Sequence, residues 1–216
     1  MLMVRDFSTM FQQMSGMPIG SKGAASMLKQ AGIDTGSKQY QAVIKDMNTL
    51  AGGGIAYTNP QAIRNLMNNY DEDGDRKDPV TGLSGLIVTD KNRMNKNKII
   101  PIPESSREEM FNLVKKEFLQ NNGEIDGNTT KRGDVYTNLY KKMGKNERLA
   151  AGHTLEQYER AYRKALSDTV KSGSPGWKEG KPVPSKALDG ITREAIDNTL
   201  IKSGGQLIRR SVNYSI

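Results

Sequence analysis

The stretch from Thr154 to Val170 constrains the fold more than any other part of the sequence, because its apolar residues repeat with helical spacing. Thr154 and Gln157 form a capping-box pattern, which marks the start of a helix. The stripe that follows advances in steps of three and four residues, and it consists of Leu155, Tyr158, Tyr162, Leu166 and Val170. This spacing places the five side chains on one face, so the sequence predicts a helix that packs against other elements.

Weaker patterns of the same kind predict a mainly α fold. Helix start and stop signals bracket apolar stripes near residues 21–31, 35–50, 59–67, 104–119, 130–143 and 192–202. Two β-like runs, at 86–88 and 99–102, predict a small β-hairpin near 85–102. We therefore expect a single helical domain of six or seven helices over 23–202. A flexible N-terminal arm at 1–22 and a C-terminal tail at 203–216 complete the expected organisation.

Composition limits the classes of protein to which this chain can belong. Hydrophobic residues make up 35% of its 216 positions and Gly occurs 22 times, which predicts a modest core with much loop. Cysteine is absent, so disulfides and thiolate sites are excluded. No run approaches the ~20 apolar residues that span a bilayer. Arg5 and Asp6 interrupt the N-terminal stretch, so we expect a cytoplasmic protein, or one exported without a cleavable signal peptide.

An acidic stretch follows the helix expected at 59–67, and its spacing indicates oxygen ligation of a hard cation such as calcium. Asp71, Asp73 and Asp75 occupy positions one, three and five of an EF-hand-like loop over 71–82. Lys77 would contribute its carbonyl at position seven, and Asp78 follows as a further carboxylate. The sequence therefore predicts a metal site at these five residues.

The second half of this loop departs from the EF-hand pattern. Arg76 stands where a glycine normally makes the sharp turn, and Gly82 stands where the bidentate carboxylate belongs. Either Asp78 or the more distant Asp90 would have to complete the ligand set. Two interpretations stay open, namely a weak calcium site and a solvated turn in which Asp side chains cap backbone groups.

A basic loop is the second candidate site. The chain carries 32 Lys and Arg against 24 Asp and Glu, a formal net charge of +8. Four cations, Lys91, Arg93, Lys96 and Lys98, fall within eight residues of one expected loop. Positive charges gathered on one face bind the phosphate backbone of nucleic acids. The alternative is that these side chains, like the Lys and Arg of the helices, are only solvated.

Evidence for catalysis is weaker, and the sequence favours a non-enzymatic role. The single histidine, His153, has no acid or nucleophile beside it in the sequence. Carboxylates near helix starts have an ordinary explanation in the helix dipole. The acid–base pairs that could be drawn from them are Glu104 with Glu108 and Glu109, and Glu124 with Asp126.

Four stretches resemble an uncharacterised family of proteins from clostridia-like Gram-positive bacteria. They are LKQAGIDTGSKQY, YDEDGDRKDPVTGL, IPESSREEMF and GHTLEQYERAYRKAL, and the resemblance covers about residues 26–202. It implies a bacterial host and no assigned activity, so it gives no functional residues.

Together these features predict a non-enzymatic binding or structural protein with a protein partner, stabilised by a calcium-like cation in the acidic loop. The first alternative is a nucleic-acid-binding protein that uses the basic loop and Lys/Arg helix faces. A further alternative, suggested by the Met-, Ser- and Gln-rich first 22 residues, is a substrate of a signal-less export system.

Overall fold

The computed structural model describes residues 20–50, 60–124 and 130–210, and its contacts divide the chain into two compact units. The N-terminal unit lies within residues 1–87 and the C-terminal unit within residues 88–216. Each has its own cluster of buried apolar side chains. The sequence predicted one helical domain over 23–202, so the division at residue 87 is a finding of the structure. Most of the predicted arm at 1–22, and residues 211–216 of the predicted tail, lie outside the described residues.

Within its described residues, 20–50 and 60–87, the N-terminal unit contains three short helices, namely α2 (Lys22–Gln30), α3 (Lys38–Leu50) and α4 (Pro60–Met67). Ser21 caps α2, because its side chain accepts a hydrogen bond from the Ala24 N–H at 3.2 Å. Pro60 is the first residue of α4, where a backbone N–H would have no partner within the helix. The small core of this unit consists of Leu28, Ile33, Tyr40, Val43, Ile63 and Tyr70. All three helices match the sequence prediction.

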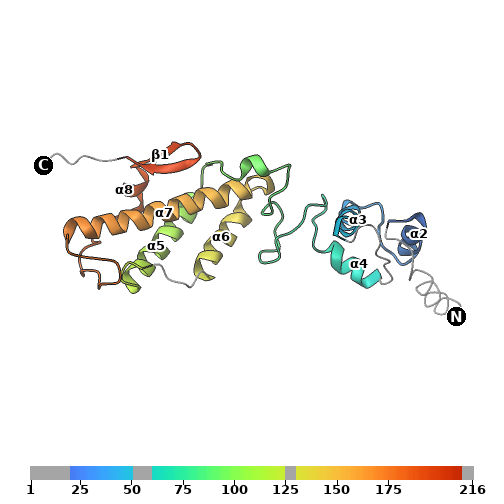
Figure 1. Ribbon diagram of the computed structural model, residues 1–216, viewed down its shortest axis with the longest axis horizontal. Coiled ribbons are helices and arrows are strands. Elements are labelled where there is room, and N and C mark those ends of the chain that lie inside the picture. The colour runs from blue at the N-terminus through green and yellow to red at the C-terminus, as the bar shows by residue number, and fades with distance from the viewer. Residues whose placement is uncertain (1–19, 51–59, 125–129, 211–216) are drawn as a thin grey trace. The chain divides into compact units, whose positions relative to one another are not determined.

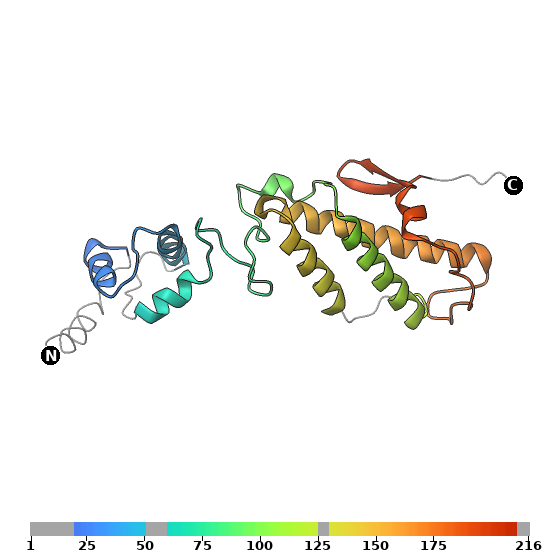
Figure 2. The ribbon, with the colours of Figure 1, turned by 180° about the vertical axis from the view of Figure 1, so that it is seen from behind.

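The C-terminal unit is a helical bundle of α5 (Glu104–Gln120), α6 (Thr130–Lys142) and α7 (Arg148–Gly173) (Figures 1 and 2). Short 3-10 turns precede α5 and α7, namely η1 (Arg93–Asn95) and η2 (Lys145–Glu147). A final short helix, α8 (Arg193–Asp197), contacts both α5 and α7. Helix α7 is central, because α5, α6 and α8 all pack on it. Four members of its predicted stripe are fully buried, namely Leu155, Tyr162, Leu166 and Val170.

Helix α7 begins at Arg148 rather than at the predicted Leu155, so Thr154 lies inside the helix. The Thr154 hydroxyl is buried, donates to the Ala150 carbonyl at 2.7 Å and accepts from the Ile100 N–H at 3.1 Å. Gly152 also lies inside α7. A Cβ at this position would lie 2.6 Å from the Tyr140 hydroxyl oxygen, so glycine is required for close packing between α7 and α6.

The mainly α class with a small β-hairpin is confirmed, but the hairpin lies elsewhere than predicted. Its strands are β1 (Leu200–Ser203) and β2 (Gln206–Arg209), which are antiparallel and joined by Gly204 and Gly205. Both glycines have positive φ, 54° and 75°, as a tight two-residue hairpin turn requires. Part of the tail predicted at 203–216 is therefore strand β2.

The segment near 85–102 was predicted as the hairpin, and it contains no strand. Its backbone groups are used differently. The Ile100 N–H donates to the Thr154 side chain, and Pro101 has no N–H to give to a ladder. Ile102 is buried in the core of the bundle. The apolar residues at 99–102 thus reflect packing of an irregular chain on the bundle and not strand pairing, whereas Val88 in the other run is 42% exposed.

Two glycines of the C-terminal unit allow a matched test of this packing. Gly123 has φ 83°, and a Cβ there would lie 2.6 Å from Cη2 of Trp177. We expect Gly123→Ala to lower the free energy of unfolding by roughly 1–3 kcal/mol, because the added carbon overpacks the core at a strained backbone position. Urea unfolding followed by the fluorescence of Trp177, the single tryptophan, measures the change.

Gly133→Ala is the control, because a Cβ at this position in α6 meets no atom within 4 Å. Alanine favours the helix, so this variant should be more stable than the natural protein by roughly 0.5–1 kcal/mol. Shifts of the same sign in the two variants would contradict the packing described here.

Candidate functional site

The predicted cation loop is an ordered turn that follows α4. The Asp71 carboxylate accepts hydrogen bonds from the Asp73 N–H at 3.1 Å and the Asp75 N–H at 2.8 Å. The backbone closes the same turn, because the Asp71 N–H donates to the half-buried Asp75 carbonyl and the Gly74 N–H donates to the Asp71 carbonyl, both at 2.9 Å. Asp71 therefore caps backbone groups, a role that short acidic side chains commonly have in turns.

The exit of the loop is ordered in a similar way. One oxygen of Asp78 accepts from both the N–H and the hydroxyl of Thr81, each at 2.8 Å. Lys77, whose carbonyl was a predicted ligand, donates its N–H to the Asn69 carbonyl at 2.8 Å and forms an isolated β-bridge with Ser84. The acidic stretch thus has a defined structural role in a tight double turn.

The loop packs against the start of α3. A Cβ at Gly74 would lie 2.8 Å from the Lys38 carbonyl oxygen, and the Lys38 Nζ lies 3.3 Å from Asp73 Oδ1. The Tyr70 hydroxyl donates to the Asp46 carboxylate in α3 at 2.6 Å, and burial together with this hydrogen bond raises the pKa of Tyr70 to about 12. Negative charge at the N-terminus of a helix is favourable, which gives the acidic residues an electrostatic partner in α3.

Calcium binding by this loop stays a prediction. In the part of the chain that the structure describes, no three Asp, Glu or His side chains are grouped to hold a metal ion. Asp71 and Asp78 already accept hydrogen bonds from the backbone. A cation would have to share these oxygens with N–H groups or displace them.

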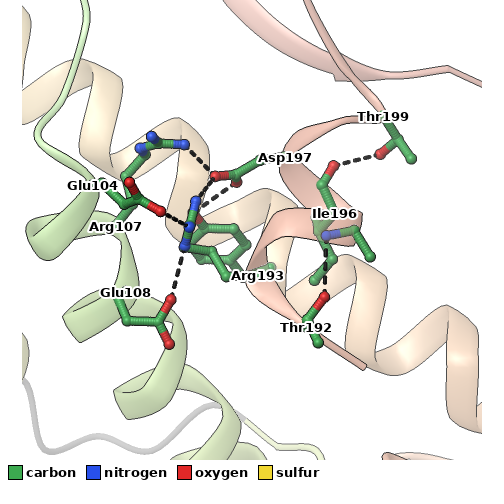
Figure 3. Close-up of polar contacts among 10 residues, drawn as sticks. Glu104, Arg107, Glu108, Thr192, Arg193, Ile196, Asp197 and Thr199 are labelled. Atoms are coloured by element: carbon green, nitrogen blue, oxygen red, sulfur yellow. Dashed lines mark hydrogen bonds and ion pairs between the residues drawn. The ribbon is translucent and has the colours of Figure 1, made fainter. Parts of the chain in front are cut away.

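A charge cluster joins α5 to α8 (Figure 3), and its Glu104 and Glu108 are 73% and 49% exposed. Arg193, with a side chain only 9% exposed, reaches carboxylates on both helices. Its guanidinium contacts Glu104, lies 2.8 Å from Glu108 and lies 2.6 Å from Asp197. A planar guanidinium presents several N–H donors at fixed angles, so it can satisfy three acceptors at once.

Asp197 connects this cluster to α7. Arg107 contacts the same Asp197 oxygen as Arg193, and the Tyr162 hydroxyl donates to the other oxygen at 2.9 Å. Burial and the nearby Asp197 raise the pKa of Tyr162. Arg107 also lies over the Tyr158 ring, 5.4 Å from its centroid. Two arginines and a tyrosine thus surround one carboxylate that is 10% exposed.

Two of the carboxylates proposed as acid–base groups belong to the Arg193 cluster. Glu104 and Glu108 both bind Arg193, and Glu109 accepts from the Asn138 amide at 3.5 Å. The Glu124 carbonyl accepts from Arg163 at 3.4 Å, whereas Asp126 lies outside the described residues. The His153 ring lies 2.8 Å from the Gly205 carbonyl in the hairpin turn.

A second buried cluster ties α5, α6 and α7 together. Glu117 is 3.0 Å from Arg132 and 3.9 Å from Arg163, and Arg132 is 3.2 Å from Glu159. The Tyr136 hydroxyl donates to Glu159 at 3.0 Å. Sequence reasoning missed both clusters. One available signal was Glu117, which falls on the apolar face of α5 three residues after Val114.

The predicted nucleic-acid residues Lys91, Arg93, Lys96 and Lys98 are all exposed on one loop, and that loop is fixed to the bundle. The Asn95 side chain donates to the Asn146 carbonyl beside η2 at 3.1 Å. The Thr154 hydroxyl lies 3.3 Å from the Lys98 carbonyl. Of the four cations, Arg93 alone has an ion pair within the described residues, with Asp90 at 3.1 Å.

The hairpin turn also contacts the basic loop. A Cβ at Gly205 would lie only 2.7 Å from the Asn97 carbonyl oxygen, so the two backbones are in close contact. Three elements that are distant in sequence, the basic loop, the start of α7 and the hairpin, therefore meet at one corner (Figure 2).

Net charge is divided unequally between the two units. Residues 1–87 contain eight Lys and Arg against eight Asp and Glu, whereas residues 88–216 contain 24 against 16. The whole excess of +8 therefore belongs to the C-terminal unit.

Comparison with known proteins identifies a family. Residues 33–216 match the family model described as Domain of unknown function (DUF3879). The chain belongs to this family. Searches of curated proteins and of solved structures found no match. The match covers most of the described residues of both units, and its description assigns no activity to DUF3879 proteins. No helix in the described ranges is long and apolar enough to cross a membrane.

Because Arg193 contacts three carboxylates, we expect its replacement to lower the stability of the protein substantially. Arg193→Met should lower the free energy of unfolding by roughly 3–5 kcal/mol, because it removes the buried cation that pairs with the buried Asp197. Arg160→Met is the matched control. Arg160 pairs with Glu156 in α7 while 70% exposed, and loss of such a surface pair costs less than about 1 kcal/mol. Urea unfolding at neutral pH measures both, and similar losses would argue against a structural role for the cluster.

Because Asp71 accepts hydrogen bonds from two backbone N–H groups, we expect its replacement to lower stability even without calcium. Asp71→Ala should destabilise the N-terminal unit by roughly 1–2 kcal/mol in the presence of a chelator, because two backbone N–H groups lose their acceptor. Asp71→Asn keeps an acceptor oxygen and should lose less. Amide hydrogen exchange of α3 and α4 reports on this unit. A loss that appears only when calcium is added would instead indicate ligation.

Proposed function

We propose that this DUF3879 protein is a non-catalytic binding protein that contacts the phosphate backbone of nucleic acid through its basic loop. The observation that carries the proposal is the anchoring of Lys91, Arg93, Lys96 and Lys98 on a fixed loop with all four side chains exposed. Cations that are held on one surface release condensed counterions together when they meet a polyanion.

The charge of the whole unit supports the same partner. The C-terminal unit carries the entire +8, so a polyanion would be attracted to it over a distance of about one Debye length, ~8–10 Å. Asn97 is exposed between Lys96 and Lys98, whereas the side chains of Asn92 and Asn95 form hydrogen bonds within the protein. Amide side chains of this kind commonly hydrogen-bond phosphate and sugar oxygens.

Surface composition favours a duplex over a single strand or a membrane. The aromatic residues among the described positions of the C-terminal unit are buried or half-buried, so they offer little stacking surface for unpaired bases. Met94, 85% exposed, is the one large apolar side chain within the loop. A membrane-binding surface normally combines its cations with several apolar anchors.

The test measures binding of a fluorescein-labelled duplex DNA of mixed sequence by anisotropy at several salt concentrations. The variant replaces Lys91, Arg93, Lys96 and Lys98 with Gln. It should bind more weakly, and the slope of log K against log salt should fall by about 0.9 for every phosphate that the loop no longer neutralises.

A matched control removes the same charge elsewhere. Lys116, Lys178, Lys181 and Lys186 are exposed, and they lie on α5 and on the 174–190 loop after α7. Their replacement by Gln should leave most of the affinity and the slope. Equal losses in the two variants, or no binding by the natural chain at ~50 mM salt, would overturn the proposal.

The remaining expectations from the sequence stay proposals. These are a clostridial host, a cytoplasmic or signal-less exported location and a calcium-like cation in the acidic loop.

A further inference from the structure

We infer that the outer edge of strand β1 is a docking site for an extended, acidic segment of a partner protein, which adds a third strand to the hairpin. This site is separate from the basic loop, and it does not depend on nucleic-acid binding. The inference rests on the backbone of β1, the side chains on its outward face, the fixation of the hairpin and the charge of its surroundings.

The backbone of β1 has an open edge. Among the described residues β1 pairs only with β2, in the register Leu200 opposite Arg209 and Ile201 opposite Ile208. Just beyond the strands, the Arg210 N–H donates to the Thr199 carbonyl at 2.8 Å. Hydrogen-bonded pairs alternate along an antiparallel ladder, so the N–H and C=O groups of Leu200 and Lys202 point away from β2. An extended peptide can pair with such groups.

The outward face of the hairpin carries an apolar pair. Arg209 lies 2.9 Å from Asp168 of α7, so the face that contains Arg209 and Leu200 is turned toward the bundle. Ile201 and Ile208 are opposite each other on the other face, and they are 37% and 44% exposed. Alternate side chains of an added strand would lie beside Ile201 on this face and supply specificity.

The hairpin is fixed before any partner binds. Strand β2 packs on α7, the Arg209–Asp168 ion pair holds its end, and the Gly205 carbonyl lies 2.8 Å from the His153 ring. A two-stranded hairpin is marginal by itself, so these contacts to the bundle keep β1 extended. Less entropy is then lost when a third strand pairs with it.

Charge selects the kind of partner. Lys202 lies in β1 and is exposed, and the unit that contains it carries the whole net charge of +8. A second copy of this chain that paired through β1 would bring its own Lys202 to the same edge, which like-charge repulsion disfavours. An acidic extended segment would instead pair a carboxylate with Lys202 while its backbone bonds to Leu200 and Lys202.

The experiment uses the full chain and a synthetic probe, the capped peptide Glu-Val-Glu-Val-Glu-Val. Titration followed by NMR should give saturable shifts at the amides of Leu200 and Lys202, with slower hydrogen exchange at both. Lys202→Glu should weaken binding by about tenfold or more, and it should improve binding of Lys-Val-Lys-Val-Lys-Val. This exchange of preference distinguishes docking at the edge from damage to the hairpin.

Lys178→Glu is the matched control, because Lys178 is exposed on the 174–190 loop and its reversal changes the net charge equally. It should leave binding of the acidic peptide within about twofold of the natural chain. The inference is overturned if millimolar peptide gives no saturable shifts at Leu200 and Lys202, or if the two variants lose affinity equally. Concentration-dependent self-association that is abolished in Lys202→Glu would also overturn it, in favour of a second copy.

Discussion

The position of the last part of the chain depends on one buried guanidinium. Arg193 is the first residue of α8, and its contacts with Glu104 and Glu108 hold that helix against α5. Asp197, at the end of α8, carries the same network to Tyr162 in α7. Strand β1 begins three residues later, so the place of the hairpin follows from this cluster. Removing Arg193 would take a partner from Asp197, which is only 10% exposed, so the loss of this residue is expected to be costly.

Ion pairing between arginines and carboxylates inside the bundle also explains which positive charges remain at the surface. Arg107, Arg132, Arg163 and Arg193 all meet carboxylates at the helix interfaces. These arginines neutralise buried acids and contribute little to the outer surface. The excess positive charge is therefore carried mainly by exposed lysines and by the loop at 91–98. The N-terminal unit is different, because its acidic residues gather in one turn beside α3 and its net charge is zero.

The sequence predicted most of the helices, because apolar spacing and end signals act locally. The last prediction, a helix over 192–202, was wrong in its second half, because α8 ends at Asp197 and residues 200–202 belong to strand β1. Residues such as Leu155, Tyr162 and Leu166 had to face a core whatever the rest of the chain did. It predicted the hairpin at the wrong place, because apolar content at 99–102 reflects burial of Ile102 and not strand pairing. The Gly204–Gly205 turn between short alternating runs was the better signal. The capping-box pattern at Thr154 predicted a wrong helix start for a related reason. The Thr154 hydroxyl accepts a hydrogen bond from the distant Ile100 N–H, and tertiary contacts of this kind leave no local pattern.

The same difference between local sequence patterns and tertiary contacts applies to the candidate sites. The residues of the acidic and basic loops could be selected from the sequence, but their hydrogen bonds could not. In the acidic loop those bonds occupy Asp71 and Asp78 with backbone N–H groups, which gives the carboxylates a structural use. The basic loop is held by the hydrogen bond from Asn95 to Asn146 and, just after the loop, by the bond from the Ile100 N–H to Thr154, while its cationic side chains stay exposed. The conformational entropy of that loop is therefore lost on folding and not on binding, so its charges are preorganised for a polyanion. Identical residues on an unanchored loop would have the same net charge, but they would lose more conformational entropy on binding and would therefore bind a polyanion more weakly.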